Sequence, residues 1–341
     1  MNHYVKTLLS VMLFVFLFFV GWSYSHAWEK KPIRIDGRTM GTTYHITYFD
    51  AQARDFKTSV DSLLLLVNRS INTYDSSSEV SLFNSGKAIK FNLPYFYPVL
   101  NKSKEVFDAS SGAFDPTVMP LVNAWGFGPA REAMPDSARI DSLKQLVGFT
   151  KILFNPDSVW KTDDRIQLDF GGIGQGFGAD IITAFLKGKG IKNMLVELGG
   201  EGMACGANLK SGKAWELGIV DPNSTHENQF LKAYVSLTDR SYTTAGNYFN
   251  YYEIDGRKYA HTIDPATGYP AQNDLLSVSV FSEDCTIADA WDTALMAMGR
   301  EKAIALLRQH PEIDAFLIFS TPQGLGTFAT EKIAPYLTIV Q

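Results

Sequence analysis

The sequence contains little cysteine and no surplus of positive charge. Its 341 residues include two cysteines, Cys205 and Cys285, too few for a disulfide framework, so they are either buried thiols or a single bridge. Lysine and arginine number 31 against 36 aspartates and glutamates, which gives a net charge of −5. Because a nucleic-acid backbone has to be neutralised by basic side chains, this balance does not predict nucleic-acid binding. Phosphate binding would instead require backbone N–H groups, helix N-termini or a divalent cation.

Long apolar runs are also scarce, and the clearest one lies near the N-terminus. Residues 8–20 are almost entirely apolar, follow Lys6 and precede the pattern Ser25-His26-Ala27. This layout predicts a signal peptide over residues 1–27, cleaved after about Ala27. The run is shorter than the roughly 20 residues that span a bilayer, but its extension through Trp22 leaves an uncleaved signal anchor as the alternative. We therefore expect an extracytoplasmic protein in the periplasm, anchored to the inner membrane if the segment is retained.

The rest of the chain has the composition of an ordinary globular protein, with 45% hydrophobic and 20% charged residues. Periodicity predicts a hairpin over 33–49 and helices over 56–72, 94–111, about 176–186, and 286–307 with a break near Gly299. Short β-rich runs lie at 152–154, 166–170, 194–198, 215–220, 233–237, 251–254, 276–281, 315–319 and 326–329. This irregular order predicts an α+β fold: one domain over residues 33–341, built of interleaved halves, with a mixed, largely antiparallel sheet flanked by helices.

A glycine-rich segment at residues 169–178 is the first candidate for a functional site. It begins with Asp169, follows a predicted strand and opens a predicted helix. Backbone N–H groups in such a turn can approach a pyrophosphate at the positive end of the helix. The segment has neither the Rossmann spacing nor the Lys-Ser/Thr of a P-loop, and a tight strand-to-helix connection is the alternative interpretation.

Asp289 and Thr293 form the second candidate, because residues four apart project from one face of a helix. A carboxylate and a hydroxyl oxygen are hard ligands that suit Mg²⁺, an ion that keeps several waters and leaves room for phosphate oxygens. The alternative is an acidic residue favoured by the helix dipole beside a packed threonine.

The third candidate is the segment 261–268, in which a strand end leads into a turn marked by proline and glycine. Near neutral pH, the imidazole of His261 is suited to take a proton from a hydroxyl nucleophile, although a histidine here can also be purely structural. Asp264 is expected to stabilise the turn through its own side chain.

The order of these segments resembles that of the ApbE family of FAD:protein FMN transferases, over the range from Met40 to about Gly299. The matching segments are Met40-Gly41-Thr42-Thr43-Tyr44, Asn72-Thr73-Tyr74 followed by Ser78-Glu79, Gly112-Ala113-Phe114-Asp115-Pro116-Thr117, Trp125-Gly126-Phe127, 169–176, Leu198-Gly199-Gly200, Trp215 with 218–222, 244–248, 261–268 and 289–294.

The resemblance implies a Mg²⁺-dependent enzyme that cleaves FAD, attaches FMN through a phosphoester to a Thr or Ser of a partner protein, and releases AMP. FAD is then a substrate, and the acceptors are exported or membrane redox flavoprotein subunits that carry a Ser/Thr flavinylation motif. Such enzymes work outside the cytoplasm, in agreement with the apolar N-terminus. Two alternatives would use the same site: an FAD pyrophosphatase with water as acceptor, and a non-catalytic extracytoplasmic flavin-binding protein.

The resemblance also assigns roles to individual residues. His261 would be the base that activates the acceptor hydroxyl, and the metal would be held by Asp289, Thr293 and the backbone carbonyl of Gly172. The FAD site would comprise Met40, Tyr74, Ala113, Phe114, Asp115, Asp169, Gln175 and Thr262.

Two positions depart from the family pattern. Gln175 stands where the family usually has lysine; it can donate hydrogen bonds to phosphate but brings no charge. Thr286 stands where many relatives have an acidic residue near the metal, which leaves either a lower metal affinity or a water at that position.

Overall fold

The computed structural model describes residue 12 and residues 31–129, 134–225, 227–247, 251–254, 257–260 and 262–340. Apart from Met12, the predicted signal segment lies outside the described residues, and so does His261. Within the described ranges, no helix combines the length and the apolar character needed to cross a membrane.

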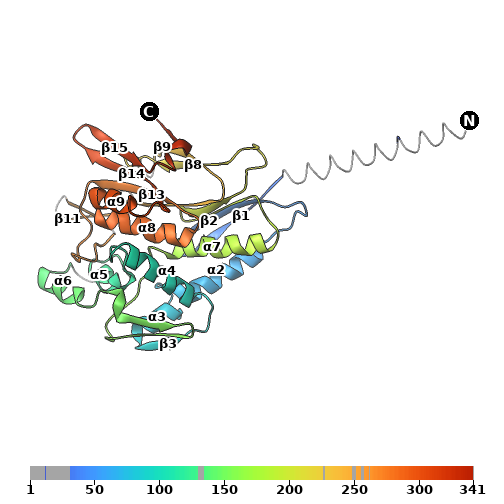
Figure 1. The fold of residues 1–341 in the computed structure, drawn as a ribbon. Helices are drawn as coiled ribbons and strands as arrows, with labels where there is room; N and C mark the ends of the chain where they lie inside the picture. Colours follow the sequence, from blue (N-terminus) through green and yellow to red (C-terminus); the bar gives the residue numbers. More distant parts are fainter. Residues whose placement is uncertain are drawn as a thin grey trace, which may run out of the picture.

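An eight-stranded sheet forms the centre of the molecule (Figure 1). Its strands lie in the order β1 (Pro32–Thr39), β2 (Thr42–Phe49), β6 (Met194–Leu198), β7 (Glu201–Cys205), β10 (Arg240–Gly246), β13 (Leu275–Phe281), β14 (Asp314–Thr321) and β15 (Gly324–Ala329). Every neighbouring pair is antiparallel. Because side chains alternate between the faces of a strand, Tyr44 and Ile46 of β2 join the buried cluster on one side of the sheet and Phe49 joins the cluster on the other.

Three helices pack on one face of this sheet: α2 (Lys57–Ile71), α7 (Gly174–Gly188) and α8 (Cys285–Met298) (Figure 1). Leu64 of α2, Ile182 of α7 and Val196 of β6 lie in the same buried cluster, which fixes the helices against the sheet. The helix α9 (Arg300–Leu307) follows α8 after Gly299, whose φ of 79° favours glycine and breaks the helical run. The break predicted near Gly299 is therefore confirmed.

The opposite face is covered by a three-stranded sheet in the order β16 (Leu337–Ile339), β9 (Leu231–Leu237) and β8 (Trp215–Val220). Trp215, Phe281 and Phe316 are buried between the two sheets. A separate hairpin pairs β11 (Tyr251–Ile254) with β12 (Arg257–Ala260). The central sheet thus has helices on one side and strands on the other.

A second half of the structure lies beyond α7 and α8, at the bottom of Figure 1. It contains α3 (Glu79–Ser85), α4 (Phe96–Ala109), α5 (Met119–Ala124), α6 (Ser137–Lys144) and a sheet in the order β3 (Ala88–Lys90), β5 (Ser158–Lys161), β4 (Ile152–Asn155). Short 3₁₀ helices lie at Pro116–Val118, Phe149–Lys151 and Ala334–Tyr336. Phe96 of α4, Phe170 and Trp291 of α8 share one buried cluster, so this half packs directly on the helical layer.

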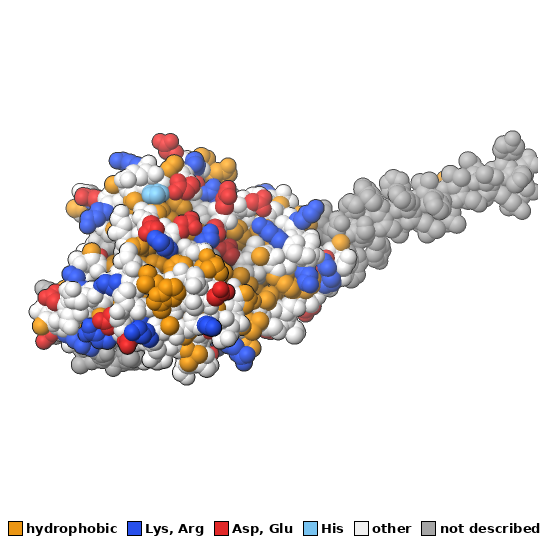
Figure 2. Space-filling model, turned by 60° about the horizontal axis from the view of Figure 1, so that its bottom comes forward, with side chains coloured by type: hydrophobic (Ala, Val, Ile, Leu, Met, Phe, Trp, Pro, Cys, Tyr) orange, Lys and Arg blue, Asp and Glu red, His pale blue; other side chains and the backbone are white. Residues whose placement is uncertain are grey.

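Acidic and basic side chains are interspersed over the face that Figure 2 displays, and apolar side chains gather near its centre. This face carries no large area of one charge, in agreement with the composition.

The α+β class, the hairpin and the main helices are confirmed, but one predicted strand is wrong. Residues 166–170 form no strand, because their backbone groups bond to side chains and loops instead. Lys161 Nζ donates to the Ile166 carbonyl at 2.7 Å, and Asn84 Oδ1 accepts from Leu168 N at 2.7 Å. The strands β3, β5, β7, β10, β12 and β16 and the helices α3 and α5 were not predicted. Both cysteines are buried thiols, so the single bridge left open by the sequence does not form.

Candidate active site

The glycine-rich turn at residues 169–174 leads directly into α7. Asp169 Oδ1 accepts a hydrogen bond from Gly171 N at 2.9 Å, and burial raises the pKa of the Asp169 carboxyl. Gly172 lies directly against α8: a Cβ there would be 2.6 Å from Thr293 Oγ1. Only glycine allows this approach without displacing the threonine, so the turn and α8 meet at this point.

Asp289 of α8 lies beside the same turn and is 5% exposed. Its Oδ2 accepts a hydrogen bond from Gly176 N, in the first turn of α7, at 2.8 Å. A Cβ on Gly176 would be 2.7 Å from the Cβ of Asp289, which explains glycine at that position as well. Burial raises the pKa of Asp289 to about 7, and the Asp180 carboxylate adds to the rise. The structure therefore brings together Gly172, Asp289 and Thr293, the three residues predicted to hold a metal.

Their donor set fits Mg²⁺, because a carboxylate, a hydroxyl and a backbone carbonyl all supply hard oxygen ligands. In the part of the chain that the structure describes, no group of three or more His, Cys, Asp or Glu side chains is arranged to hold a metal ion. A cation at this position would therefore take mixed ligands.

Gln175 and Met40 lie close to the start of α7, where Gly172, Asp289 and Thr293 meet. A Cβ on Gly199, in the turn between β6 and β7, would be 2.7 Å from Gln175 Nε2, which places the amide against that turn. Met40 has a φ of 49° in the turn between β1 and β2, and a Cβ on Gly178 would be 3.3 Å from Met40 Cε. Both predicted FAD residues thus lie around the N-terminal half of α7.

Ala113, Phe114 and Asp115 precede the 3₁₀ helix at Pro116–Val118 in the other half of the structure. Asp115 Oδ1 accepts from Thr117 N and Oγ1 at 2.8 and 2.6 Å, and Oδ2 accepts from Phe149 N at 3.2 Å. Burial raises the pKa of Asp115. Its carboxylate therefore organises the local backbone, while its role toward FAD stays a prediction. Phe114 is buried and Ala113 half-buried.

Tyr74 and Thr262 lie on segments that the loop after α5 contacts. Tyr74 is 69% exposed and its hydroxyl donates to the Phe127 carbonyl at 3.2 Å. Trp125 Nε1 donates to the Gly268 carbonyl at 2.9 Å, in the turn that follows Thr262. Thr262 is buried and its carbonyl accepts from Ala271 N. This contact pattern holds the 262–271 segment beside the loop that contains the Trp125-Gly126-Phe127 motif.

The turn role predicted for Asp264 is confirmed. Its Oδ1 accepts from Ala266 N at 2.9 Å, and its Oδ2 accepts from Thr267 Oγ1 at 3.0 Å. His261, the predicted base, lies outside the described residues, so its position relative to this turn stays a prediction.

Three acidic side chains near the site were not predicted: Asp180, Glu201 and Asp292. Burial, reinforced by the Asp289 carboxylate, raises the pKa values of Asp292 and Glu201 well above their ordinary range. Asp292 lies inside the 289–294 segment that matches the family, and Glu201 directly follows the Leu198-Gly199-Gly200 motif, so the position of each in the sequence was a signal that could have identified it.

Asp180 of α7 explains the unusual Thr286. Its Oδ2 accepts from Thr286 N and Oγ1 at 2.8 and 2.6 Å, and its Oδ1 accepts from Cys285 N at 3.1 Å. Burial, together with the Asp284 carboxylate, raises the pKa of Asp180 to about 7. The Thr286 hydroxyl thus joins α7 to the first turn of α8 by binding this carboxylate.

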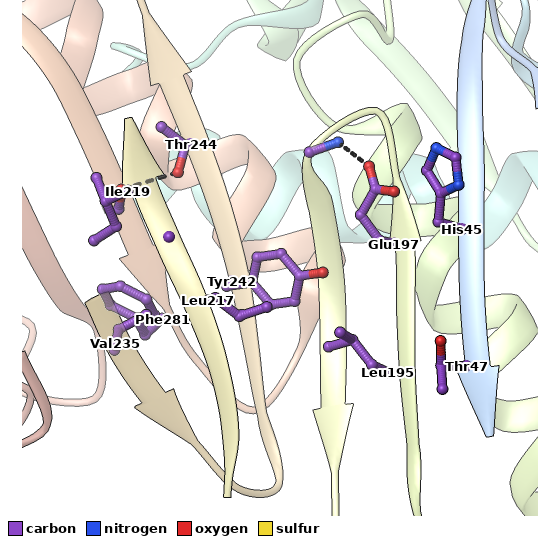
Figure 3. Close-up of a pocket in the computed structure, with 13 residues that line it drawn as sticks. His45, Thr47, Leu195, Glu197, Leu217, Ile219, Val235, Tyr242, Thr244 and Phe281 are labelled. Carbon is purple, nitrogen blue, oxygen red and sulfur yellow. Dashed lines mark hydrogen bonds between the residues drawn. The ribbon is translucent and has the colours of Figure 1, made fainter. Parts of the chain in front are cut away.

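A cavity of about 330 Å³ opens on the other face of the central sheet, between that sheet and β8 and β9 (Figure 3). Glu197, His45 and Tyr242 lie at its polar side, and Glu197 Oε1 accepts from Gly200 N at 2.6 Å. None of the predicted site residues lines it. The cavity approaches the predicted site at the turn between β6 and β7, where Gly200 lines the cavity and the preceding glycine contacts Gln175.

Comparisons with known proteins agree with this architecture. The model of the ApbE family matches residues 40–317. The FAD:protein FMN transferase of Vibrio cholerae serotype O1 is 32% identical over 323 residues, 91% of this chain and 95% of the relative. That of Haemophilus influenzae is 33% identical over 313 residues, 88% and 90% of the two chains.

Solved structures give the same result. The flavin transferase ApbE from Vibrio cholerae has a TM-score of 0.81 at 31% identity and covers 90% of this chain and 99% of its own. The apo form of the Pseudomonas stutzeri flavinyl transferase ApbE has a TM-score of 0.79 at 31% identity, over 90% and 96% of the chains.

These relatives are flavin transferases, and they share the α+β fold of this chain. Together with the oxygen ligands at the glycine turn and α8, they define an enzyme of the flavin-transferase class. The chain belongs to the ApbE family. The resemblance drawn from its motifs is therefore confirmed.

Proposed function

We propose that this protein is an FAD:protein FMN transferase that depends on Mg²⁺. It would attach FMN, through a phosphoester, to a Thr or Ser of an exported or membrane redox protein and release AMP. The observation that carries the proposal is the meeting of Gly172, Asp289 and Thr293 at the glycine turn that opens α7. The proteins named FAD:protein FMN transferase among its relatives support the choice of substrate.

The first task of the site is to bind a doubly charged pyrophosphate without a basic cleft. The N-terminus of α7 presents backbone N–H groups and the positive end of the helix dipole. Gln175 adds an amide donor beside them. Asp289, Thr293 and the Gly172 carbonyl would hold Mg²⁺, which supplies neutralisation of charge on phosphate oxygens when bound.

The chemical step breaks the phosphoanhydride bond of FAD and forms a new phosphoester bond to the acceptor. The acceptor hydroxyl oxygen attacks the phosphorus of the FMN half, the bond from that phosphorus to the bridging pyrophosphate oxygen breaks, and AMP leaves with that oxygen. The imidazole of His261 would take the hydroxyl proton, a task suited to a group that titrates near neutral pH. The remaining demand on the protein is to position both substrates, because phosphoryl transfer needs little covalent chemistry from the enzyme.

We also propose that the protein works outside the cytoplasm, exported or anchored to the inner membrane by residues 1–27. The apolar run that follows Lys6 supports this location. Fractionation of cells that express the tagged protein tests it: recovery in the cytoplasm with an intact N-terminus would contradict it.

Incubation of the full-length protein with FAD, Mg²⁺ and a candidate acceptor tests the proposed activity, with mass spectrometry of the acceptor as the readout. We expect the added mass of FMN on a Thr or Ser, release of AMP, and loss of both with a chelator or in Asp289→Asn. AMP and free FMN with every tested acceptor unmodified would support a pyrophosphatase instead, and intact bound FAD would support a flavin-binding protein.

A further inference from the structure

Glu201 is a buried carboxylate that the proposed reaction does not yet use. It is the first residue of β7 and is 7% exposed. Among the described residues, its Oε2 has no hydrogen-bond partner. A buried polar oxygen without a hydrogen-bond partner lowers the stability of the fold and is rare in proteins. Its presence here indicates that the oxygen binds a ligand.

The position of Glu201 in β7 determines which side of the sheet it faces. Met203 and Cys205, two and four residues further along the strand, pack in the cluster beneath α2 and α7, whereas Ala204 packs in the cluster on the opposite face. By the alternation of a strand, Glu201 shares the helical side with Met203 and Cys205. The carboxylates that act on it most strongly are Asp289 and then Asp292, both on α8.

This placement puts the Glu201 carboxyl on the side of the sheet where α8, the helix of Asp289 and Thr293, packs: Cys285 Sγ at the start of α8 donates to the carbonyl of Gly202, the next residue of β7, at 3.3 Å. Asp289 is held from the other direction by Gly176 N of α7. Direct coordination by several acids is not the arrangement present in the described residues. A carboxylate set back from the ion can still contact it through water, because Mg²⁺ retains several waters and groups around its direct ligands orient them.

We propose that Glu201 is an outer-sphere carboxylate of the metal centre, whose Oε2 accepts a hydrogen bond from the hydration shell of the cation held by Asp289, Thr293 and the Gly172 carbonyl. The inference rests on the proposed function, since it assumes a cation at these three residues. Glu201 is thus a positioning residue that acts on the metal and not on FAD.

The proposal gives Glu201→Gln two effects of opposite sign. Without metal, burial and the carboxylates of α8 oppose ionisation of Glu201, a cost that the neutral glutamine avoids, so the apo protein should unfold at a higher temperature. With metal, the loss of charge should weaken Mg²⁺ binding about 10-fold or more, the range typical of groups around direct ligands. A residue that only packs the core would not produce this pair of effects, because glutamine keeps the size of glutamate.

Glu197→Gln is the matched control. Glu197 belongs to β6 of the same hairpin, but its side chain lines the cavity on the opposite face (Figure 3). Removing this carboxylate from the hairpin should leave Mg²⁺ binding unchanged. Asp289→Asn is the second reference, because it removes a direct ligand on which the proposed function depends.

The experiment is titration of the full-length protein with MgCl₂ by calorimetry, together with thermal unfolding in chelator and in saturating Mg²⁺. A higher apo unfolding temperature and about 10-fold weaker Mg²⁺ binding in Glu201→Gln, with wild-type binding in Glu197→Gln, support the proposal. Wild-type Mg²⁺ affinity in Glu201→Gln overturns it, and so does a lower unfolding temperature in chelator.

Asp289→Asn separates this inference from the proposed function. If it binds Mg²⁺ as the wild type does, the metal assignment itself is wrong. If it loses binding while Glu201→Gln does not, only the role of Glu201 fails. Should Glu201→Gln not fold, Glu201→Asp, which keeps the charge but withdraws it by one methylene, takes its place: weaker Mg²⁺ binding supports the proposal and unchanged binding overturns it.

Discussion

Gly172→Ala tests the contact between the glycine turn and α8 on which the proposed site depends. An added Cβ would lie 2.6 Å from Thr293 Oγ1 and 3.0 Å from its Cγ2, whereas ordinary contacts of a Cβ begin at 3.4 Å. The turn and α8 must therefore separate by several tenths of an ångström. Displacements of this kind in a packed interior cost about 1–3 kcal/mol of unfolding free energy.

The same displacement separates the Gly172 carbonyl from the Thr293 hydroxyl, two of the three proposed metal ligands. We expect Mg²⁺ affinity to fall by about 10-fold or more and FMN transfer to fall with it, because misplacement by an ångström alone can cost on the order of 100-fold in rate. Gly188→Ala at the end of α7 is the control, since a Cβ there meets nothing within 4 Å.

Urea unfolding in chelator and calorimetric titration with MgCl₂ measure the two effects separately. The double variant Gly172→Ala/Thr293→Ala removes the hydroxyl and the methyl that the new Cβ would meet. It should recover most of the lost stability but not the Mg²⁺ affinity. If Gly172→Ala alone keeps wild-type stability and wild-type Mg²⁺ affinity, the reasoning that joins this turn to α8 is wrong.

Three further substitutions have defined outcomes. Because burial raises the pKa of Asp289 to about 7, its protonation stabilises the apo fold below about pH 4, and that contribution is lost as the pH rises from about 4 to 7. In chelator, Asp289→Asn should reduce this fall in unfolding free energy by up to about 4 kcal/mol, and an unchanged pH profile would contradict the assignment. Lys161→Met should cost about 3 kcal/mol in urea unfolding, because Nζ donates to three backbone carbonyls; a loss below about 1 kcal/mol would be inconsistent with these contacts. Gln175→Lys should tighten FAD binding roughly 10-fold in a flavin fluorescence titration, and unchanged affinity would mean that the phosphates are neutralised elsewhere.

Features that depend only on residues close together in the sequence could be predicted from the sequence. The four-residue spacing of Asp289 and Thr293 is enough to predict that they share one face of a helix. The glycines within 171–178 indicate that another group approaches the backbone closely there. Asp264 followed by Pro265 indicates a turn from local chemistry. These predictions required only the geometry of one helix or one turn.

Features that depend on contacts across the fold were missed. Residues 166–170 have the apolar pattern of a strand, but Asn84 and Lys161 bind their backbone from distant segments. Glu201 directly follows the Leu198-Gly199-Gly200 motif in the sequence. Its proximity to Asp292, however, follows only from the packing of α8 on the central sheet. Sequence periodicity contains no information on such pairings.

The charge of the proposed site makes metal binding and FAD binding depend on each other. Asp289 and Glu201 supply carboxyl groups, and Gln175 supplies an uncharged amide where the family usually has lysine. Among the described residues assigned to this site, none carries a positive charge, so Mg²⁺ should raise FAD affinity strongly. Linkage then requires FAD to raise Mg²⁺ affinity by the same factor. Gln175→Lys should reduce this factor, because the lysine supplies part of the positive charge itself, and an unchanged factor in FAD titrations with and without Mg²⁺ would place position 175 out of reach of the phosphates.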